Sequence, residues 1–576
     1  MGAAALIMAF SVLVSRFMGL FRDKIISWQF GAGGEADIYF SAFVVPDFLN
    51  YLLAGGYVSI TLIPLLSRRF EESEEDGWRF FSTVFCWATL AIGVLTALAW
   101  IAAPVLAPLV APGFTEAQCA RLTEFLRIVL PAQVFFLPGA CLSAILYIRH
   151  QFTVPALMPL IYNGCILLFG VGMPWLGLAQ GMEGFCWGVL VGAALGAFVL
   201  PLQTVKAGGF RFLPGLAHPL MKKFLLMALP LMIGQSVVVL DEQFVRIFGS
   251  MAGEGSVSLL NYARRIMMVP VGVVAQAAGV ASFPFLAALA AKGDMEQFRS
   301  TLNRTMKNSM MIAVPVAAWM ITASGPVLGF IFEGGSFSTA HTSGAAPLLQ
   351  IMLLAVPFWL LQQVTGRAFY AMQDTVTPAV VGTIATLLAV PGYYVFIPLM
   401  GAKGVALVTT ASIAVYAVVL LAIACRRWAT GAFEGVWITA WRSVLLSMPG
   451  CGIMLAVMQD GSRLLSGLSP LAQQFIILAL GGTLFVVSWL LLSYFFQRHY
   501  FWTVLYPFLR RLHPRKPRAA KAVAAGEGAE SGAKVEAVVK AEAVSESIEA
   551  AEGGEGVAAK AAPASEDSKK AEGPGA

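Results

Sequence analysis

The chain has 576 residues, of which 58% are hydrophobic and only 12% are charged, and its mean hydropathy is +0.77. A soluble domain of this composition would expose more apolar surface than water tolerates, so the composition excludes a soluble globular protein and indicates a chain that lies in a lipid bilayer. The formal net charge of +6 understates the basicity of residues 1–518, because residues 519–576 carry 11 acidic and 6 basic side chains.

Apolar stretches of about 20 residues, the length that crosses a hydrocarbon core of ~30 Å, recur throughout residues 1–500. Backbone polar groups in lipid must be satisfied within the segment, and no period-two strand pattern is present, so we predict an all-α polytopic membrane protein. The first apolar run, Ala3 to Val14, continues without a small-residue cleavage site and predicts a membrane helix rather than a cleaved signal peptide. In chain order the apolar runs predict fourteen helices, near residues 3–28, 37–66, 80–110, 122–148, 152–174, 184–205, 219–248, 256–290, 305–332, 345–372, 376–398, 402–425, 437–459 and 472–497.

Lysines and arginines in the connections predict the orientation, because they collect on the cytoplasmic side of membrane proteins. With the N-terminus in the cytoplasm, the cytoplasmic connections contain Arg68, Arg69, Arg79, Arg149, Lys206, Arg211, Lys222, Lys223, Lys292, Arg299, Arg304, Arg426 and Arg427. The opposite connections contain little more than Arg121, Lys403 and Arg463. This alternation predicts an even number of spans, with both termini in the cytoplasm.

The region after the last predicted helix divides into two parts. Residues 501–518 mix aromatic and basic side chains, a combination that suits the headgroup region of an anionic leaflet. Residues 519–576 are rich in Ala, Glu, Lys and Gly, and we predict that they are disordered.

The predicted helices contain an internal duplication. Phe30-Gly31 precedes the second helix as Phe248-Gly249 precedes the eighth, and Gly181-Met-Glu-Gly184 opens the sixth as Gly401-Ala-Lys-Gly404 opens the twelfth. The paired segments lie about 220 residues apart, which makes each half six helices long and gives both halves the same orientation. We therefore predict an N-lobe over residues 1–215, a C-lobe over residues 216–430 and an extra helix pair over residues 431–500. Parallel repeats are a known transporter architecture with the substrate site between the halves, and the alternative is a duplicated fold that serves only as a scaffold.

Charged side chains inside the predicted spans indicate where function lies. Arg16, near the middle of the first helix, costs about 2.5 kcal/mol or more in lipid unless it faces protein or water. Asp23 follows seven residues later on the same helical face. Further charged or polar residues of the spans are Arg22, Asp37, Asp47, Asn50, Asp241, Glu242, Arg246, Arg264 and Arg265. The structural alternative is that Arg22 only lies at the interface and that Asp241 pairs with Arg246 to hold helices together.

Arginines from both halves predict a cationic chamber between them. Guanidinium groups bind phosphate oxygens bidentately and stay charged when partly dehydrated, so a diphosphate headgroup is the expected guest. No G-x-x-x-x-G-K-[ST] motif is present, so the energy for transport must come from an ion gradient, the membrane potential or substrate flux. The seven cysteines and five histidines lack metal-ligand spacing, and we expect no metal or other cofactor beyond a coupling monovalent cation. A membrane-embedded glycosyltransferase would need a catalytic acid in a sizeable extramembrane loop, and the connections here are short.

Six segments carry a resemblance to a known family. They are Ser15-Arg-Phe-Met-Gly-Leu-Phe-Arg-Asp23, Phe30-Gly-Ala-Gly33, Ala36-Asp-Ile-Tyr-Phe40, Val45-Pro-Asp-Phe-Leu49, Tyr262-Ala-Arg-Arg265 and Phe369-Tyr-Ala-Met-Gln-Asp-Thr-Val-Thr-Pro378. Together they make nearly all of residues 1–500 resemble the MurJ (MviN) family of lipid II flippases, in the multidrug/oligosaccharidyl-lipid/polysaccharide exporter superfamily. The resemblance implies fourteen helices and an essential central cavity for the pyrophosphate and sugar of lipid II. It implies that this cavity contains Arg16, Arg22, Asp37 and Arg265, to which we add Asn50 and Arg264 as candidate substrate-binding residues.

The chain also departs from the family pattern. Asn50-Tyr51 stands where many members have Arg-Arg, Gly55 replaces the usual glutamate, and Arg264 stands where aspartate is common. Some members have a sodium site that uses polar residues of the eleventh helix, but residues 385–394 read Ala-Thr-Leu-Leu-Ala-Val-Pro-Gly-Tyr-Tyr here. Asp241 and Thr409 remain as candidate ligands for a coupling ion.

The expected function is therefore a flippase that moves undecaprenyl-diphosphate-linked peptidoglycan precursor, lipid II, across the bacterial inner membrane by alternating access. The alternative is a flippase for another polyprenyl-diphosphate-linked glycan of the O-antigen type, or another exporter. A drug exporter predicts an acidic chamber, against which the arginines argue. The expected partners are lipid II, membrane lipids and proteins of cell-wall synthesis, and no catalytic residue is expected.

Overall fold

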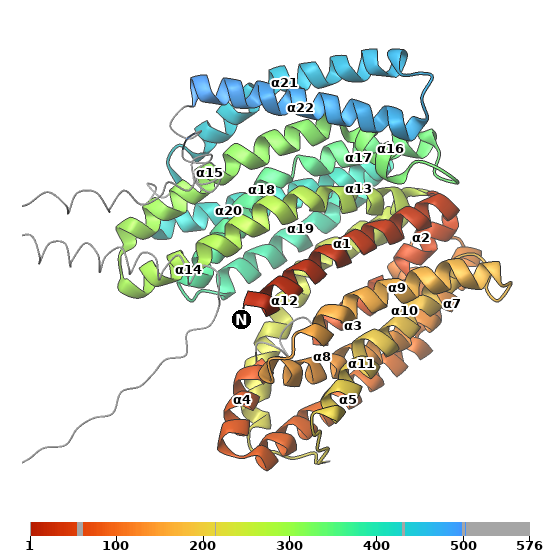
Figure 1. Cartoon of the computed structure of the whole chain (residues 1–576), viewed down its shortest axis with the longest axis vertical. Coiled ribbons are helices and arrows are strands. Elements are labelled where there is room, and N and C mark those ends of the chain that lie inside the picture. The colour runs from red at the N-terminus through yellow and green to blue at the C-terminus, as the bar shows by residue number, and fades with distance from the viewer. Residues whose placement is uncertain (1, 54–60, 214, 429–432, 498–501, 503–576) are drawn as a thin grey trace, which may run out of the picture. The chain divides into compact units, whose positions relative to one another are not determined.

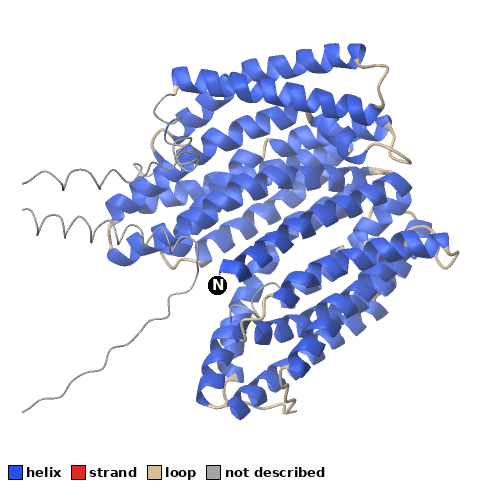
Figure 2. Ribbon diagram, viewed as in Figure 1, coloured by secondary structure: helices blue, strands red, loops and turns tan. Residues whose placement is uncertain are grey.

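The computed structural model describes residues 2–53, 61–213, 215–428, 433–497 and 502. Within these ranges every regular element is a helix, apart from one isolated bridge between Gly334 and Phe337 (Figure 2). Of the described residues, those from Ser11 onward belong to one compact unit, and all contacts discussed below lie within it. The predictions for Gly55, for nearly all of the basic and aromatic segment 501–518 and for the tail 519–576 lie outside the described residues.

The helices of the first half of the chain follow the predicted runs closely (Figure 1). They are α1 (Gly2–Phe30), α2 (Gly34–Ser41), α3 (Val44–Leu53), α4 (Ile63–Glu72), α5 (Glu74–Ile101), α6 (Ala103–Val110), α7 (Glu116–Val129), η2 (Leu130–Ala132), α8 (Gln133–Ile148), α9 (Thr153–Trp175), α10 (Glu183–Gly192), η3 (Ala193–Val199) and α11 (Leu200–Ala207).

The second half and the C-terminal helices follow in the same way. They are α12 (Met221–Ser250), α13 (Ser256–Pro270), η4 (Val271–Gln276), α14 (Ala277–Lys292), α15 (Met295–Thr322), α16 (Ser324–Phe332), α17 (Thr339–Leu353), α18 (Val356–Ala371), α19 (Val376–Met400), α20 (Ala402–Trp428), α21 (Val436–Leu464) and α22 (Pro470–Phe496).

Several stretches that were predicted as one helix are broken in the structure. Proline stands in the first turn after the break between α5 and α6, in η2, and in the first turn of α18. Proline cannot donate an intrahelical hydrogen bond, so it ends one helix and is tolerated at the start of the next. Another break separates α15 from α16, which meet at 73°.

Nine helical segments of the described chain are long and apolar enough to cross a membrane, and the bent pair of α15 and α16 makes a tenth if it is one span. This confirms an all-helical, polytopic membrane protein. The stretches around α1, α2 to α4, α12 and α13 to α14 are outside this set. They carry the intramembrane charges that the sequence analysis singled out.

Helix neighbours follow the two halves of the chain. In the first half, α9 packs on α10 and α5 on α8, and in the second half α19 packs on α20 and α14 on α18. The last two helices, α21 and α22, lie side by side, with α15 against α21 (Figure 1). The halves meet where α3 packs on α12 and where α2 packs on α13. Apart from Thr409, which lies on α20, the candidate residues lie on the helices of these two contacts and on α1.

Candidate functional site

Two guanidinium groups share one buried carboxylate between the halves. The side chain of Asp23, on α1, has no exposed surface. Its Oδ1 accepts hydrogen bonds from Nε and Nη2 of Arg22 at 3.1 and 3.0 Å, and its Oδ2 accepts one from Nε of Arg265, on α13, at 2.5 Å. Two cations on one anion leave a net positive charge at this point. Arg22, Asp23 and Arg265 are called the triad below.

The two arginines of the triad differ in their exposure and in how many of their N–H groups have a protein partner. Arg22 is 16% exposed, and its Nη1 also donates to Oδ1 of Asn163, on α9, at 3.3 Å. Arg265 is 45% exposed, and among the described residues its two Nη groups donate to no protein atom. Arg265 is therefore the member of the triad that can hydrogen-bond a bound anion without giving up its ion pair.

Arg16 adds a second available cation. It is exposed, and within the described part of the chain it makes no ion pair or hydrogen bond. It precedes Asp23 by two helical turns on the same face of α1, which places it about 10 Å from the triad along the helix axis. Asn50, on α3, is half-buried one turn after Asp47. The structure therefore places Arg22 and Arg265 on the same carboxylate, and it puts Arg16 on the same face of α1 as Asp23.

Asp37, on α2, accepts two backbone hydrogen bonds at the start of α13. Its carboxylate is 1% exposed, and its Oδ2 and Oδ1 accept hydrogen bonds from the backbone N–H groups of Gly255 and Ser258 at 2.6 and 2.7 Å. Gly255 precedes α13 and Ser258 is its third residue. The first N–H groups of a helix have no intrahelical partner, and its N-terminus favours negative charge. Asp37 from the first half thus caps a helix of the second half.

Further hydrogen bonds join the halves at the same end of the helices. Lys24 Nζ donates to the backbone oxygen of Glu333 at 2.6 Å, and the Tyr262 hydroxyl donates to the backbone oxygen of Gly31 at 3.1 Å. The Gly34 N–H donates to Oε1 of Glu254 at 3.1 Å. We call these contacts of residues 24–37 with residues 254–262 and 332–336 the latch.

The latch depends on close backbone approach. Gly31 has φ +64°, and a Cβ there would lie 2.5 Å from the backbone oxygen of Ser336. Gly335 has φ +58°, and a Cβ there would lie 2.2 Å from the backbone oxygen of Trp28. Both positions need glycine for conformation and for space.

A second charge cluster joins α3 to α12. Nη1 of Arg246 donates to Oδ2 of Asp47 at 2.7 Å, and its Nη2 donates to Oε1 of Glu242 at 3.0 Å. The sequence alternative that paired Asp241 with Arg246 is wrong. Residues four apart share a helical face, so Glu242 meets Arg246, whereas Asp241 is five residues away and faces Arg264. The Asp241 Oδ2 to Arg264 Nη1 distance is 3.1 Å, and the two side chains are 13% and 10% exposed.

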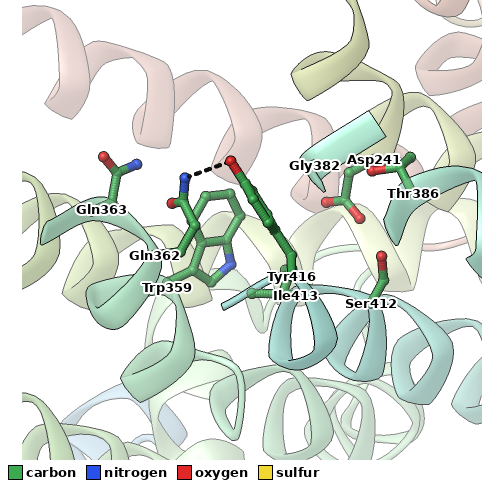
Figure 3. Close-up of a pocket in the computed structure, with 9 residues that line it drawn as sticks. All are labelled: Asp241, Trp359, Gln362, Gln363, Gly382, Thr386, Ser412, Ile413 and Tyr416. Atoms are coloured by element: carbon green, nitrogen blue, oxygen red, sulfur yellow. Dashed lines mark hydrogen bonds between the residues drawn. The ribbon is translucent and has the colours of Figure 1, made fainter. Parts of the chain in front are cut away.

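A cavity of about 60 Å³ lies beside Asp241, between α12, α18, α19 and α20 (Figure 3). Its polar lining includes Gln362, Thr386, Ser412 and Tyr416. Thr409 is not part of the lining, because its hydroxyl is buried against the Tyr393 hydroxyl at 2.9 Å. The two candidate ion ligands, Asp241 and Thr409, thus each have a protein partner.

The net positive charge of the triad favours an anion over a cation. Among the described residues, no group of three His, Cys, Asp or Glu side chains could hold a metal ion. The sequence prediction did not include Asp23, Asp47 or Arg246 in its candidate set. Asp23 is next to Arg22 in the sequence and lies on the same helical face as Arg16. This position could have identified it as a candidate.

Comparisons with known proteins agree on one family. A family model described as "Lipid II flippase MurJ" matches residues 26–463. A "Probable lipid II flippase MurJ" of Rhizobium meliloti (strain 1021) is 28% identical over 73% of this chain and 79% of that protein. A "Lipid II flippase MurJ" of Burkholderia cenocepacia is 27% identical over 69% of this chain and 78% of that protein.

Solved structures have the same fold. The structure titled "Lipid II flippase MurJ, inward closed conformation" matches with a TM-score of 0.70 at 24% identity, over 86% of this chain and 99% of that chain. An inward-facing multidrug resistance MATE family transporter of the MOP superfamily matches with a TM-score of 0.61 at 17% identity, over 75% of this chain and 99% of that chain.

Proposed function

The chain belongs to the lipid II flippase MurJ family, and we propose that it moves lipid II, the undecaprenyl-diphosphate-linked peptidoglycan precursor, from the cytoplasmic to the outer leaflet of the bacterial inner membrane. It is a multi-pass membrane protein and a transporter rather than a catalyst. The matched relatives cover most of the chain, so the proposal concerns the whole transport unit.

The triad is the observation that supports this function most directly. Two guanidinium groups on one buried carboxylate leave an excess positive charge where helices of the two halves meet, and Arg265 keeps two free donor groups there. A diphosphate carries the complementary charge and accepts paired hydrogen bonds from a guanidinium. We propose that Arg265 and Arg16 bind the diphosphate, and that Arg22 and Asp23 hold Arg265 in position. Asn50 and Arg264 are proposed to contribute further polar contacts to the headgroup.

The proposed topology has fourteen spans with both termini in the cytoplasm. Ten spans meet the apolar criterion when α15 and α16 are joined, and α1, α2 to α4, α12 and α13 to α14 would supply the other four. These four stretches carry the intramembrane charges, which are expensive and are retained where they serve function. In this topology the latch faces the outside, so it would close the outer end of a path between an N-lobe (1–215) and a C-lobe (216–430).

Alternating access then follows from the latch and the triad. Lipid II would enter from the cytoplasmic side while the latch is closed, and the headgroup would be bound by the arginines. Opening of the latch would release it to the outer leaflet. The helix pair α21 and α22, outside the duplication, is proposed to border the path of the lipid tail.

Growth of cells depleted of their own lipid II flippase tests the proposal. The wild-type chain should restore growth and the appearance of lipid II in the outer leaflet, whereas Arg16→Ala and Arg265→Ala should reduce the rate of translocation about tenfold or more, since each removes a charge-assisted contact of about 1.5–3 kcal/mol. Arg68→Ala is the matched control, because Arg68 is 77% exposed and, among the described residues, pairs only with Glu72 on the same helix. Normal lipid II translocation in depleted cells without any other flippase would contradict the function.

The same assay addresses the alternative substrate. Another polyprenyl-diphosphate glycan of the O-antigen type offers the same diphosphate to the arginines and differs in the sugar and peptide. A chain that rescued an O-antigen flippase mutant and failed to rescue lipid II translocation would support the alternative.

A further inference from the structure

The ion pair of Asp241 with Arg264 is separate from the triad, and Asp241 has no role in the proposed capture of diphosphate. It joins α12 to α13 within the second half, and both side chains are nearly buried. An aspartate in this position must be balanced by a cation, because an unpaired charge in a membrane interior is strongly unfavourable. Here the guanidinium group of Arg264 supplies that cation.

The residues around Asp241 do not fit a mobile metal cation as the structure stands. A hard cation needs several oxygen ligands that converge on one point. Oδ2 of Asp241 is bound to Arg264, and the hydroxyl of Thr409 is bound to Tyr393. A second cation beside Asp241 would also be repelled by the guanidinium group.

We propose that Arg264 is a tethered cation that fills the place of a coupling ion at Asp241, so that this chain binds no sodium in its transport cycle. An arginine stays protonated at any physiological pH, so this cation neither dissociates nor releases a proton. The cycle is then driven by the membrane potential or by the substrate gradient. The role of this ion pair in a transport cycle rests on the proposed function, whereas the pairing of Asp241 with Arg264 does not.

The cavity beside Asp241 makes the proposal sharply testable. Its volume of about 60 Å³ has room for about two water molecules. Gln362 Oε1 is buried without a hydrogen-bond partner among the described residues, and the hydroxyls of Thr386 and Ser412 also line the cavity (Figure 3). Removal of the guanidinium would therefore leave a carboxylate beside an oxygen-lined, hydrated space, which is the chemistry that a monovalent cation needs.

The test measures cation binding through thermal unfolding of the purified full-length protein, with tryptophan fluorescence as the signal. The melting temperature is compared in sodium, potassium, lithium and choline chloride at one ionic strength. The wild-type chain should melt at the same temperature in all four salts. Arg264→Met should melt at a lower temperature, and sodium or lithium should raise that temperature by about 3 °C or more above choline, because an ion that binds only the folded state stabilises it.

Two controls isolate the carboxylate. Asp241→Asn combined with Arg264→Met should lose the response to sodium, because the anion is gone. Arg427→Met breaks an arginine pair between the last turn of α20 and Asp374, which lies in the turn between α18 and α19, and should gain no response. If Arg264→Met does not fold, Arg264→Gln replaces it, and the wild-type measurement stands without either variant.

Two results would overturn the proposal. One is a sodium-specific rise in the melting temperature of the wild-type chain. The other is a folded Arg264 variant that responds to none of the cations. Neither readout uses lipid II, so failure of the tethered cation and failure of the flippase function are distinguishable.

Discussion

Asp23 is the side chain on which the geometry of the triad depends. It lies fully buried between Arg22 and Arg265, and each of its two oxygens holds one of them. The sequence could identify these arginines, because a charge within an apolar run stands out, but it could not identify the pairing. Arg265 is 242 residues from Asp23, and Arg246 is 199 residues from Asp47. Only the packing of the helices decides such pairs, whereas the alternative that paired Asp241 with Arg246 failed on helical geometry, because residues five apart do not share a face.

Replacement of Asp23 by asparagine should therefore be more harmful than its small change in shape suggests. Two neighbouring guanidinium groups would lose their shared anion, and loss of one partner from a buried ion pair destabilises by about 3–5 kcal/mol. We expect Asp23→Asn to lower the melting temperature and to fail to restore growth of flippase-depleted cells.

Glu75→Gln is the control for Asp23→Asn. Glu75 and its partner Arg79 are each 62% exposed, so the loss of this pair should change stability by less than about 0.5 kcal/mol. An Asp23→Asn chain that supported growth at the wild-type rate and at equal protein level would show that the triad is not needed.

At the scale of helices, the apolar runs of the sequence predict where the helices lie, but they do not predict where a helix is broken. Each of the nine apolar spans overlaps a predicted run, because length and hydropathy are local properties. The bend between α15 and α16 also has a local signal in Ser324-Gly325-Pro326, which the prediction of a single helix over 305–332 ignored. The cap of α13 has no such signal, since the carboxylate that supplies it comes from α2.

Asp37→Ala should loosen the start of α13 without affecting other helices. It removes the partner of two backbone N–H groups, and hydrogen bonds to a charged group contribute about 1.5–3 kcal/mol each. Amide hydrogen exchange at Gly255 and Ser258 should therefore become at least about tenfold faster. Asp37→Asn should have a smaller effect, because one acceptor oxygen remains.

Thr115→Ala provides the comparison for the cap. Thr115 caps its own helix α7 through the N–H of Gln118, so its loss should speed exchange in α7 and leave α13 unchanged. Exchange at the start of α13 that is the same in Asp37→Ala and in the wild-type chain would exclude the capping role.

At the scale of the whole transport unit, the two halves of the chain are joined in two different ways. The latch consists mainly of hydrogen bonds to backbone atoms, whereas the triad and the Asp47 cluster are ion pairs between side chains. Backbone contacts at one end can separate as a group when the halves rotate, while a bound diphosphate adds a second anion to the arginines that share Asp23. Transport by alternating access thus requires the latch to open in every cycle.

A covalent bond across the latch should therefore stop transport. In a chain without its native cysteines, Gly34→Cys with Glu254→Cys places two thiols where the Gly34 N–H now meets the Glu254 carboxylate. Oxidation or a short thiol-specific cross-linker should abolish lipid II translocation, and a cleavable cross-link should restore it on reduction. The matched control is Arg121→Cys with Glu183→Cys, whose native side chains form an ion pair within the first half. A cross-link there joins two residues of the same half, so it should not prevent the halves from separating and should leave transport unchanged. Full transport with the latch cross-linked would mean that the halves do not separate at this end, and the proposed path to the outer leaflet would be wrong.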